Sequence, residues 1–130
     1  KNYKVPFKKI KFNKACIDYI KDAKKQQRSV YLISGSHQKL VDQVNEKLKI
    51  FLEVFGTKKD FNMVGYNKVI YITNELKFHD FDYVGNSKKD LPIWHHTKNI
   101  IHTNVNNNLL KIIMTSSLPK IHIESNFISI

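Results

Sequence analysis

Short strand-like segments alternate with helix-like segments along most of this chain. Residues 29–34 (SVYLIS) form a short continuous apolar run, and residues 52–55 and 81–84 are two further runs of strand length. Short apolar runs of this kind are typical of strands that are buried on both faces of a parallel sheet. Because helical patterns separate the runs, their order indicates an α/β fold with a mainly parallel sheet.

Three amphipathic patterns predict the helices between these strands. The first follows Asn13, a residue type that caps helices, and ends near Gln27. The second follows Ser36, which we expect to cap it, and the third spans residues 66–76. Apolar residues recur at helical spacing on one face of each pattern. The inward-facing residues are Cys16, Tyr19, Ile20 and Ala23; Leu40, Val41, Val44 and Leu48; and Val69, Ile70, Thr73 and Leu76.

The last third of the chain has a less regular pattern. Residues 87–94 predict a short helical turn, and residues 99–103 (NIIHT) predict a strand. Residues 104–108 indicate a loop, residues 109–114 fit either a helix or a strand, and residues 121–130 alternate like an edge strand. No internal repeat or second domain is visible in the sequence, so we expect one domain.

The chain is strongly basic, with a formal net charge of +11. Such a balance suggests an anionic partner, nucleic acid among others. However, the 22 Lys and Arg residues are spread along the chain, and Arg28 is the only arginine. Proteins that read bases and phosphates favour the planar Arg side chain. A basic nucleic-acid-binding domain is therefore the weaker alternative, and we expect no nucleic-acid partner.

The sequence shows no feature of a membrane or secreted protein. No apolar run approaches the roughly 20 residues that cross a bilayer, and the first residues are basic with no apolar signal segment. Cys16 is the single cysteine, so neither an internal disulfide nor a cysteine-based zinc site can form. These features favour a cytoplasmic location.

Three polar motifs follow or flank the predicted elements. The sequence ISGSH at 33–37 comes directly after a strand, and GYNK at 65–68 opens a helix. The third motif, YVGNSKKDLPIW at 83–94, follows the strand that ends at residue 84. Parallel sheets bind ligands in the loops after the carboxyl ends of their strands. We therefore expect the chemistry of the chain in these loops.

In this order and spacing, the three motifs resemble the second, third and fourth motifs of the haloacid dehalogenase superfamily. The similarity covers residues 12–104 as the core of one partial domain, with residues 105–130 as an unassigned tail. SGS at 34–36 is similar to the phosphoserine-phosphatase-like group. Residues 85–94 are similar to the phosphatase-like domain fused ahead of polytopic prenyltransferases. The resemblance implies a Rossmann-like three-layer α/β/α fold whose first strand and cap are missing from this chain.

The resemblance assigns catalytic, phosphate-binding roles to Ser34 and Lys68. A phosphoryl group in transfer carries concentrated negative charge, which must be held and neutralised. Ser34 would offer its hydroxyl, while Gly35 and Ser36 would offer backbone N–H groups at a helix amino terminus. Gly35 would also let the backbone approach the phosphoryl group closely. By residue type alone Ser34 is an ordinary cap and Lys68 an ordinary surface lysine, so their positions within the motifs single them out.

The motif at 83–94, which resembles the fourth motif of the superfamily, supplies the expected metal ligands, Asp90 and Asn86. Mg²⁺ prefers hard oxygen ligands and keeps several waters, which suits a carboxylate and an amide oxygen. Many members of the superfamily have Asp at the position of Asn86, so Asn would bring less charge to the metal. The adjacent His95 and His96 have no carboxylate partner at metal-binding spacing, and we expect both on the surface.

The nucleophile of the superfamily is absent from this chain. It is the first aspartate of an Asp-x-Asp-x-Thr pattern, and the 130 residues contain no such pattern. Asp80 and Asp82 have the first spacing, but they precede a strand and we interpret them as a loop pair. The chain begins at Lys1 and not at a methionine, which suggests a processed chain, a cut piece or a fragment of a longer protein. The resemblance implies that the missing nucleophile lies before Lys1.

The resemblance thus implies a Mg²⁺-dependent phosphatase that acts on phosphorylated small molecules through an aspartyl-phosphate formed in the longer parent. The isolated chain would not turn over substrate. If the parent continues into prenyltransferase helices after Ile130, the domain would lie at the cytoplasmic face of a membrane. The alternative from a different class is a non-catalytic module that binds a phosphorylated ligand or a partner protein.

Overall fold

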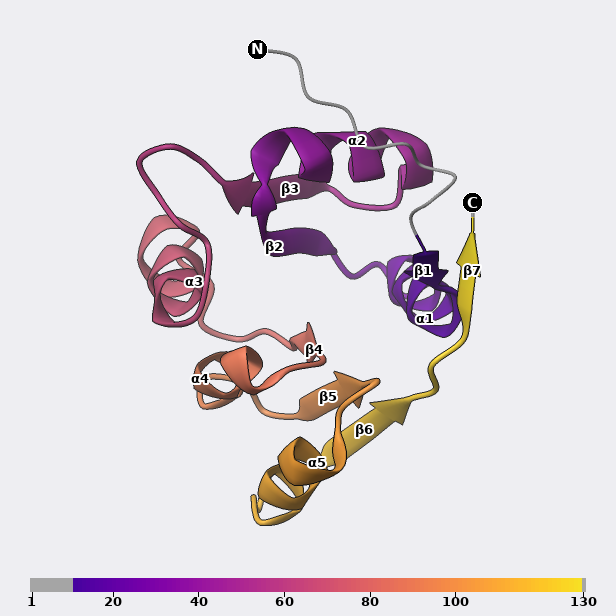
Figure 1. Ribbon diagram of the computed structural model, residues 1–130, viewed down its shortest axis with the longest axis vertical. Helices are drawn as coiled ribbons and strands as arrows, with labels where there is room; N and C mark the ends of the chain where they lie inside the picture. The colour runs from indigo at the N-terminus through magenta and orange to yellow at the C-terminus, as the bar shows by residue number, and fades with distance from the viewer. Residues whose placement is uncertain (1–10, 130) are drawn as a thin grey trace. The chain divides into compact units, whose positions relative to one another are not determined.

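The computed structural model describes residues 11–129, and the chain divides into two compact units (Figure 1). One unit runs to Val64 and takes in the chain from Ser125 onward, and the other is Gly65–Glu124. Both units combine helices with short parallel strand pairs. The predicted α/β class is therefore confirmed.

The first helix begins where the sequence predicts. α1 (Lys14–Lys25) is capped by Asn13, whose side-chain oxygen accepts a hydrogen bond from the backbone N–H of Cys16. The preceding strand β1 (Lys11–Asn13) pairs antiparallel with β7 (Phe127–Ser129). The Asn13 oxygen also accepts from the N–H of Asn126, so one side chain joins the start of α1 to the approach to β7.

A parallel strand pair and its connecting helix make up the rest of this unit. β2 (Tyr31–His37) pairs with β3 (Glu53–Thr57), and α2 (Gln38–Leu48) connects them. Val41 of α2 is fully buried, and a Cβ atom on Gly56 would lie only 2.8 Å from its Cγ2. The absence of a side chain at Gly56 therefore lets α2 lie directly against β3.

In the second unit, the helix predicted at residues 66–76 is present but changes its winding midway. α3 (Tyr66–Ile70) continues directly into a π-helix, Tyr71–Glu75. The Thr73 hydroxyl donates to the carbonyl oxygen of Val69, 2.9 Å away. Side-chain bonds of this kind compete with the backbone pattern and bend helices, which fits the wider winding around Thr73.

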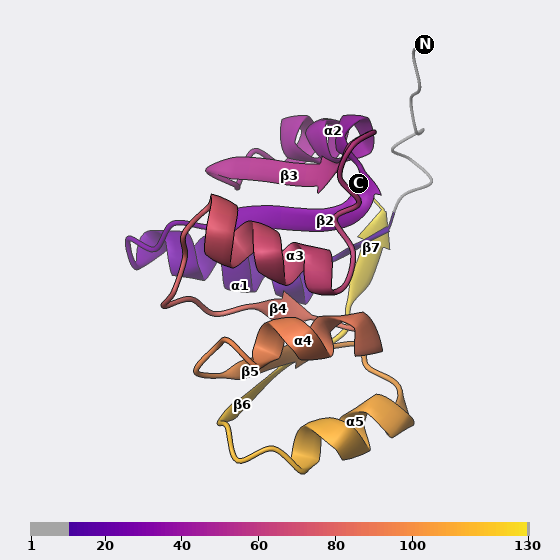
Figure 2. The same ribbon diagram turned by 90° about the vertical axis from the view of Figure 1, so that its left-hand side faces the viewer.

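The sheet of the second unit has the order β4–β5–β6, and both pairs are parallel (Figure 2). Its strands are β4 (Val84–Gly85), β5 (Ile100–Thr103) and β6 (Lys120–Ile123). The connections are a 3-10 turn (Lys88–Asp90) with α4 (Leu91–Trp94), and α5 (Asn107–Met114). Parallel neighbours need such crossovers, so this unit is built from consecutive βαβ steps.

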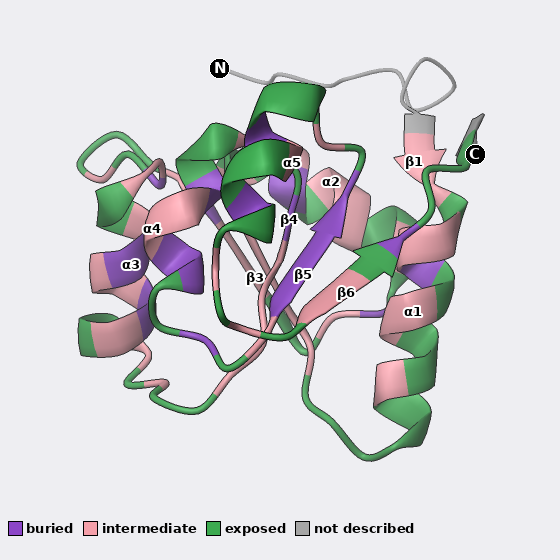
Figure 3. Ribbon diagram, turned by 90° about the horizontal axis from the view of Figure 1, so that it is seen from below, coloured by how far each residue is buried: buried purple, intermediate pink, exposed green. Residues whose placement is uncertain are grey.

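The core of the second unit lies where β5 meets α4 and α5. All four residues of β5 are buried (Figure 3). A buried cluster joins Trp94, Ile100, Leu109 and Ile113. Trp94, which the sequence predicts as core packing, is 2% exposed, and its indole N–H donates to the carbonyl oxygen of Tyr83. The cluster thereby fixes the chain just before β4.

The end of β2 differs most from its prediction. The sequence predicts a strand at residues 29–34 and a helix capped by Ser36. In the structure β2 continues to His37, and the side chain of His37 also caps α2 by accepting from the N–H of Lys39 at 3.0 Å. The cap prediction is wrong because a register irregularity between Ile33 and His37 lets the strand continue three residues farther.

Other boundaries differ by a few residues. The strand predicted at residues 52–55 is β3, which begins one residue later and ends at Thr57. Of the strand predicted at residues 81–84, only Val84 is paired, as the first residue of β4. Residues 121–130, predicted as one edge strand, hold the end of β6 and all of β7. Ile130 lies outside the described residues. Residues 109–114, which fit either state, are helical in α5.

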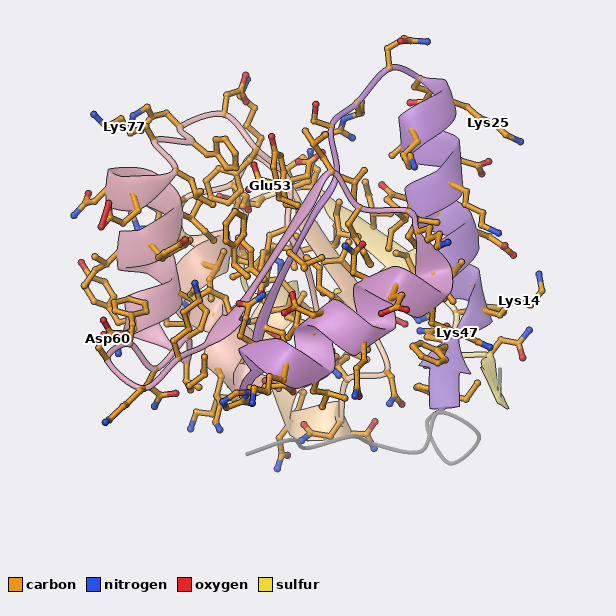
Figure 4. All side chains as sticks on the ribbon, turned by 90° about the horizontal axis from the view of Figure 1, so that it is seen from above. Lys14, Lys25, Lys47, Glu53, Asp60 and Lys77 are labelled. Carbon is orange, nitrogen blue, oxygen red and sulfur yellow. The ribbon has the colours of Figure 1, made fainter. Side chains whose placement is uncertain are left out.

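Exposed lysines come from several elements, in keeping with the scattered pattern in the sequence. Figure 4 labels Lys14 and Lys25 on α1, Lys47 on α2, and Lys77 after the π-helix, and all four are exposed. Within residues 11–129, no helix has the length and apolar character needed to cross a membrane.

Candidate functional site

Three side chains of the second unit form a continuous hydrogen-bonded row, Lys68–Tyr83–Asp90. The Lys68 ammonium Nζ donates to the Tyr83 hydroxyl oxygen at 2.9 Å, and that hydroxyl donates to Asp90 Oδ1 at 2.8 Å. Lys68 comes from α3, Tyr83 from the segment before β4, and Asp90 from the 3-10 turn. Two residues selected by the motifs are thus joined through a third that the sequence did not single out.

Asp90 also organises the loop after β4. Its Oδ2 accepts from the backbone N–H of Asn86 at 2.8 Å and of Ser87 at 3.0 Å. The Ser87 side chain completes a capping box with the backbone of Asp90. A Cβ atom on Gly85 would lie 2.7 Å from the Asp90 carboxyl group, so only glycine leaves room for the carboxylate. The GNSKKD sequence therefore forms a loop that closes around one buried carboxylate.

Burial controls the electrostatics of this row. Asp90 is 6% exposed, and its carboxylate accepts three hydrogen bonds. Burial lowers the pKa of the Lys68 ammonium, and the nearby negative charge of Asp90 acts in the opposite direction. Burial also raises the pKa of Tyr83, and the Asp90 carboxylate adds to this rise. The phenol therefore stays protonated and can donate to Asp90.

Tyr83 is held on its other sides by Trp94. Its carbonyl oxygen accepts from the indole N–H at 2.9 Å, and the two rings meet edge to face with centroids 6.4 Å apart. The Lys68 Nζ lies 5.5 Å from the centre of the Tyr83 ring, within cation–π range. The phenol is therefore fixed through its backbone, its ring and its hydroxyl.

The two expected metal ligands differ in accessibility, since Asn86 is exposed and Asp90 is buried. The amide oxygen of Asn86 is a hard donor of the kind that Mg²⁺ prefers. The Asp90 carboxylate has about four acceptor positions, of which three are used, so it has one left for a metal. Within residues 11–129, no group of three or more His, Cys, Asp or Glu side chains could hold a metal ion. The donor chemistry fits Mg²⁺, while most of the coordination sphere must come from water or from a phosphate.

Ser34, Gly35 and Ser36 belong to the first unit. They are the last residues of β2 before His37 and do not lie at a helix amino terminus, so the expected helix-end cradle is wrong. The Ser34 hydroxyl oxygen accepts from the N–H of Ser36 at 3.1 Å, so this N–H already has a partner. Within residues 11–129, the Ser34 hydroxyl keeps its own donor for another acceptor.

Packing within the first unit accounts for the glycine at position 35. A Cβ atom there would lie 2.9 Å from Val64 Cγ2 and 3.4 Å from the carbonyl oxygen of Met63. The Thr57 hydroxyl, at the end of β3, donates to the Gly35 carbonyl oxygen at 2.8 Å. The same hydroxyl oxygen accepts from the N–H of Met63. Close packing against residues 63–64 therefore explains this glycine without a ligand.

The remaining polar residues that the sequence raised have structural partners or lie on the surface. Asp82 accepts from the side-chain amide of Asn99 at 3.0 Å, and exposed Asp80 pairs with Lys98 at 3.2 Å. These contacts agree with a loop pair and give neither carboxylate the surroundings of a nucleophile. His95 and His96 are both exposed, as predicted.

A histidine pair on β5 and β6 has no counterpart in the sequence prediction. His102 and His122 are direct partners in the parallel register, and their rings stack with centroids 5.2 Å apart. His102 is 3% exposed, and within the described part of the chain its Nδ1 is buried with no hydrogen-bond partner. Burial, followed by the effect of His122, lowers the pKa of His102.

No protein-family model, curated protein or solved structure matches this chain.

Proposed function

We propose that this chain is part of a Mg²⁺-dependent phosphatase of the haloacid dehalogenase type, with a Rossmann-like three-layer core. The parallel βαβ steps support the proposal at the level of fold class. The observation that carries it is the pairing of Lys68 with Asp90 through Tyr83, because the two residues come from separate motifs of the resemblance. Lys68 is half-buried and lies within hydrogen-bond distance of Tyr83, the first residue of the motif at 83–94.

Each residue would have a defined task toward a phosphorylated small molecule. Lys68 would donate hydrogen bonds to the phosphoryl oxygens and offset their charge. Asp90 would hold the loop that presents the Asn86 amide oxygen. Ser34, in the first unit, enters the proposal through the resemblance alone, which gives its hydroxyl the role of a phosphate donor. The proposal gives Gly35 and Ser36 no role beyond their places in β2. Mg²⁺, when bound at Asn86 and Asp90, would neutralise part of the phosphoryl charge.

The nucleophilic aspartate of the proposal lies outside these 130 residues, because the sequence contains no Asp-x-Asp-x-Thr pattern. In the longer parent, that aspartate would attack phosphorus and displace the alcohol, forming an aspartyl-phosphate that water then hydrolyses. The isolated chain would bind phosphate without turning over a phosphomonoester. A cytoplasmic location, and a membrane only in a parent fused to a prenyltransferase, are parts of the same proposal.

The absence of a nucleophile also supports a second candidate function. A chain with Lys68 and Asp90 but no nucleophile could act as a non-catalytic module that binds a phosphorylated ligand or a partner protein. The phosphatase and a module for a phosphorylated ligand both require Lys68 to bind phosphate, and they differ in whether any form of the protein hydrolyses the ligand. A module that binds only a partner protein does not require phosphate binding.

Phosphate titration followed by NMR tests the phosphate binding that the phosphatase and the phosphorylated-ligand module require. Inorganic phosphate should shift the side-chain signal of Lys68 and bind the Lys68→Met variant at least about tenfold more weakly, since a charge-assisted hydrogen bond contributes roughly 1.5–3 kcal/mol. Lys111→Met, which removes an exposed lysine on α5, is the matched control and should bind as the unaltered chain does. Equal phosphate affinity in both variants would contradict the proposal.

A further inference from the structure

The Tyr83 hydroxyl is the hydrogen-bond acceptor of Lys68 within residues 11–129. An ammonium group has three N–H donors, so one is used by Tyr83 and two remain. The Tyr83 hydroxyl cannot give its own proton to Lys68, because that proton is directed to Asp90 Oδ1. The row therefore has one direction, from the ammonium through the phenol to the carboxylate.

Tyr83 also keeps Lys68 and Asp90 apart. In a direct ion pair, the carboxylate would take at least one ammonium donor and neutralise the cation at close range. Here a hydroxyl stands between them, with hydrogen bonds of 2.9 Å and 2.8 Å on its two sides. Asp90 is further occupied by the N–H groups of Asn86 and Ser87. The cation therefore stays beside a negative charge without contacting it.

The phenol is rigid enough to orient a flexible lysine. Its backbone carbonyl is bound by the Trp94 indole, and its ring lies edge to face with that of Trp94. A lysine side chain has several rotatable bonds, and ordering it before a ligand binds reduces the entropy lost on binding. A fixed acceptor at Tyr83 provides this ordering.

We propose that Tyr83 is a positioning residue of the phosphate site: it fixes the Lys68 ammonium through its hydroxyl and directs the two remaining N–H donors toward a phosphoryl oxyanion. This inference rests on the proposed function, since it needs Lys68 to bind phosphate. It adds a role for Tyr83 that the motif resemblance does not assign.

The first test measures Lys68 without any ligand. Tyr83→Phe removes only the hydroxyl and keeps the ring that meets Trp94. In ¹⁵N-lysine NMR, the Lys68 ammonium should be ordered and its protons should exchange slowly with water. In Tyr83→Phe it should become mobile and exchange rapidly. The control is Tyr66→Phe, which removes an exposed hydroxyl on α3, the helix that carries Lys68. It should change neither the order of the Lys68 ammonium nor its proton exchange.

The second test titrates inorganic phosphate into the same variants. Tyr83→Phe should bind phosphate about tenfold more weakly than the unaltered chain, because the Lys68 side chain would then lose its rotamer freedom only when phosphate binds. If Lys68→Met weakens phosphate binding and Tyr83→Phe does not, the positioning role is overturned while the proposed function stands. If Lys68→Met binds phosphate as the unaltered chain does, the proposed function itself fails.

A second measurement covers the case in which Tyr83→Phe does not fold. It uses the unaltered chain alone, in which the bond to the Tyr83 hydroxyl should hold the Lys68 ammonium before any ligand is added. A Lys68 ammonium that is already mobile and exchanges rapidly in the unaltered chain without phosphate would overturn the positioning role.

Discussion

The Asp90 carboxyl group lies only 2.7 Å from the ideal position of a Cβ atom on Gly85. Gly85 pairs with His102 in the sheet, so the carboxylate lies directly over the end of β4. The glycine of the fourth motif is therefore needed for the buried acid, and this contact is independent of any ligand.

Gly85→Ala should consequently destabilise the chain by about 1–3 kcal/mol, the usual effect of inserting a methyl group into a closely packed position. Urea unfolding measures the change. The neighbouring Asn86→Ala variant keeps its backbone N–H bond to Asp90 and should stay within about 0.5 kcal/mol of the unaltered chain. A Gly85→Ala chain as stable as the unaltered one would mean that Asp90 is not held over β4.

Gly65 should be sensitive for a different reason. It precedes α3 with φ of +59° and ψ of −131°, and a Cβ atom there would meet nothing within 4 Å. Gly65→Ala should therefore cost about 1–3 kcal/mol through backbone strain alone. The Gly65 carbonyl oxygen accepts from the N–H of Lys68, so the strain should also reach the lysine.

Urea unfolding and the Lys68 ammonium signal would measure both effects of Gly65→Ala. Lys59→Ala, an exposed change in the same connection, is the control and should alter neither. If Gly65→Ala is as stable to urea as the unaltered chain, α3 can begin with another backbone geometry at this position.

The stability of the second unit should fall as the medium becomes acidic. Because burial lowers the pKa of His102, the folded chain resists a proton that the unfolded chain accepts below about pH 6.5. The contribution of His102 is thus fully present above the unfolded pKa and decreases as the pH falls below it, down to the lower folded pKa. The stacked ring of His122 adds to the effect, since two imidazolium charges would repel.

Urea unfolding of the His102→Gln variant between about pH 7.5 and 5.5 checks this sign. The variant should lose part of the acid sensitivity, while His95→Gln, at an exposed position, should keep it. Identical pH dependence in all three proteins would be incompatible with a neutral buried His102.

The cap of α5 offers a prediction with a close control. The Asn106 side-chain oxygen accepts from the N–H of Leu109 at 2.8 Å. Asn106→Ala should lower the free energy of unfolding by about 1 kcal/mol. Asn107→Ala, at the first helical position, should have a much smaller effect. Similar losses in the two variants would argue against the cap.

The sequence predicts those features that depend on local chemistry. Asn13 is recognisable as a cap because its residue type and the following apolar spacing agree, and α1 begins there. The strand on 99–103 and the turn from residue 87 are also confirmed within a residue or so. Periodicity places these elements because each has one strongly apolar face or run.

Other features depend on contacts that the sequence does not display. Ser36 has the residue type of a cap, but the continuation of β2 moves this role to His37, and a histidine cap has no comparable sequence signal. Tyr83 stands in a strand pattern where an aromatic residue indicates packing, and only the fold brings its hydroxyl between Lys68 and Asp90. The one clue in the sequence that could have marked Tyr83 as a site residue is its position directly before Val84 and Gly85.

The nucleophile is the central claim of the phosphatase proposal, and the coding sequence upstream of Lys1 tests it most directly. The proposal predicts an Asp-x-Asp-x-Thr pattern after an apolar strand, roughly 70 to 150 residues before Ser34, which leaves room for a strand, a cap and a linker. The longer protein should then hydrolyse p-nitrophenyl phosphate with Mg²⁺, and replacing the first aspartate by Asn should abolish this activity. An upstream sequence without the pattern, or Mg²⁺-dependent hydrolysis by the 130-residue chain that Asp80→Asn removes, would contradict the proposal.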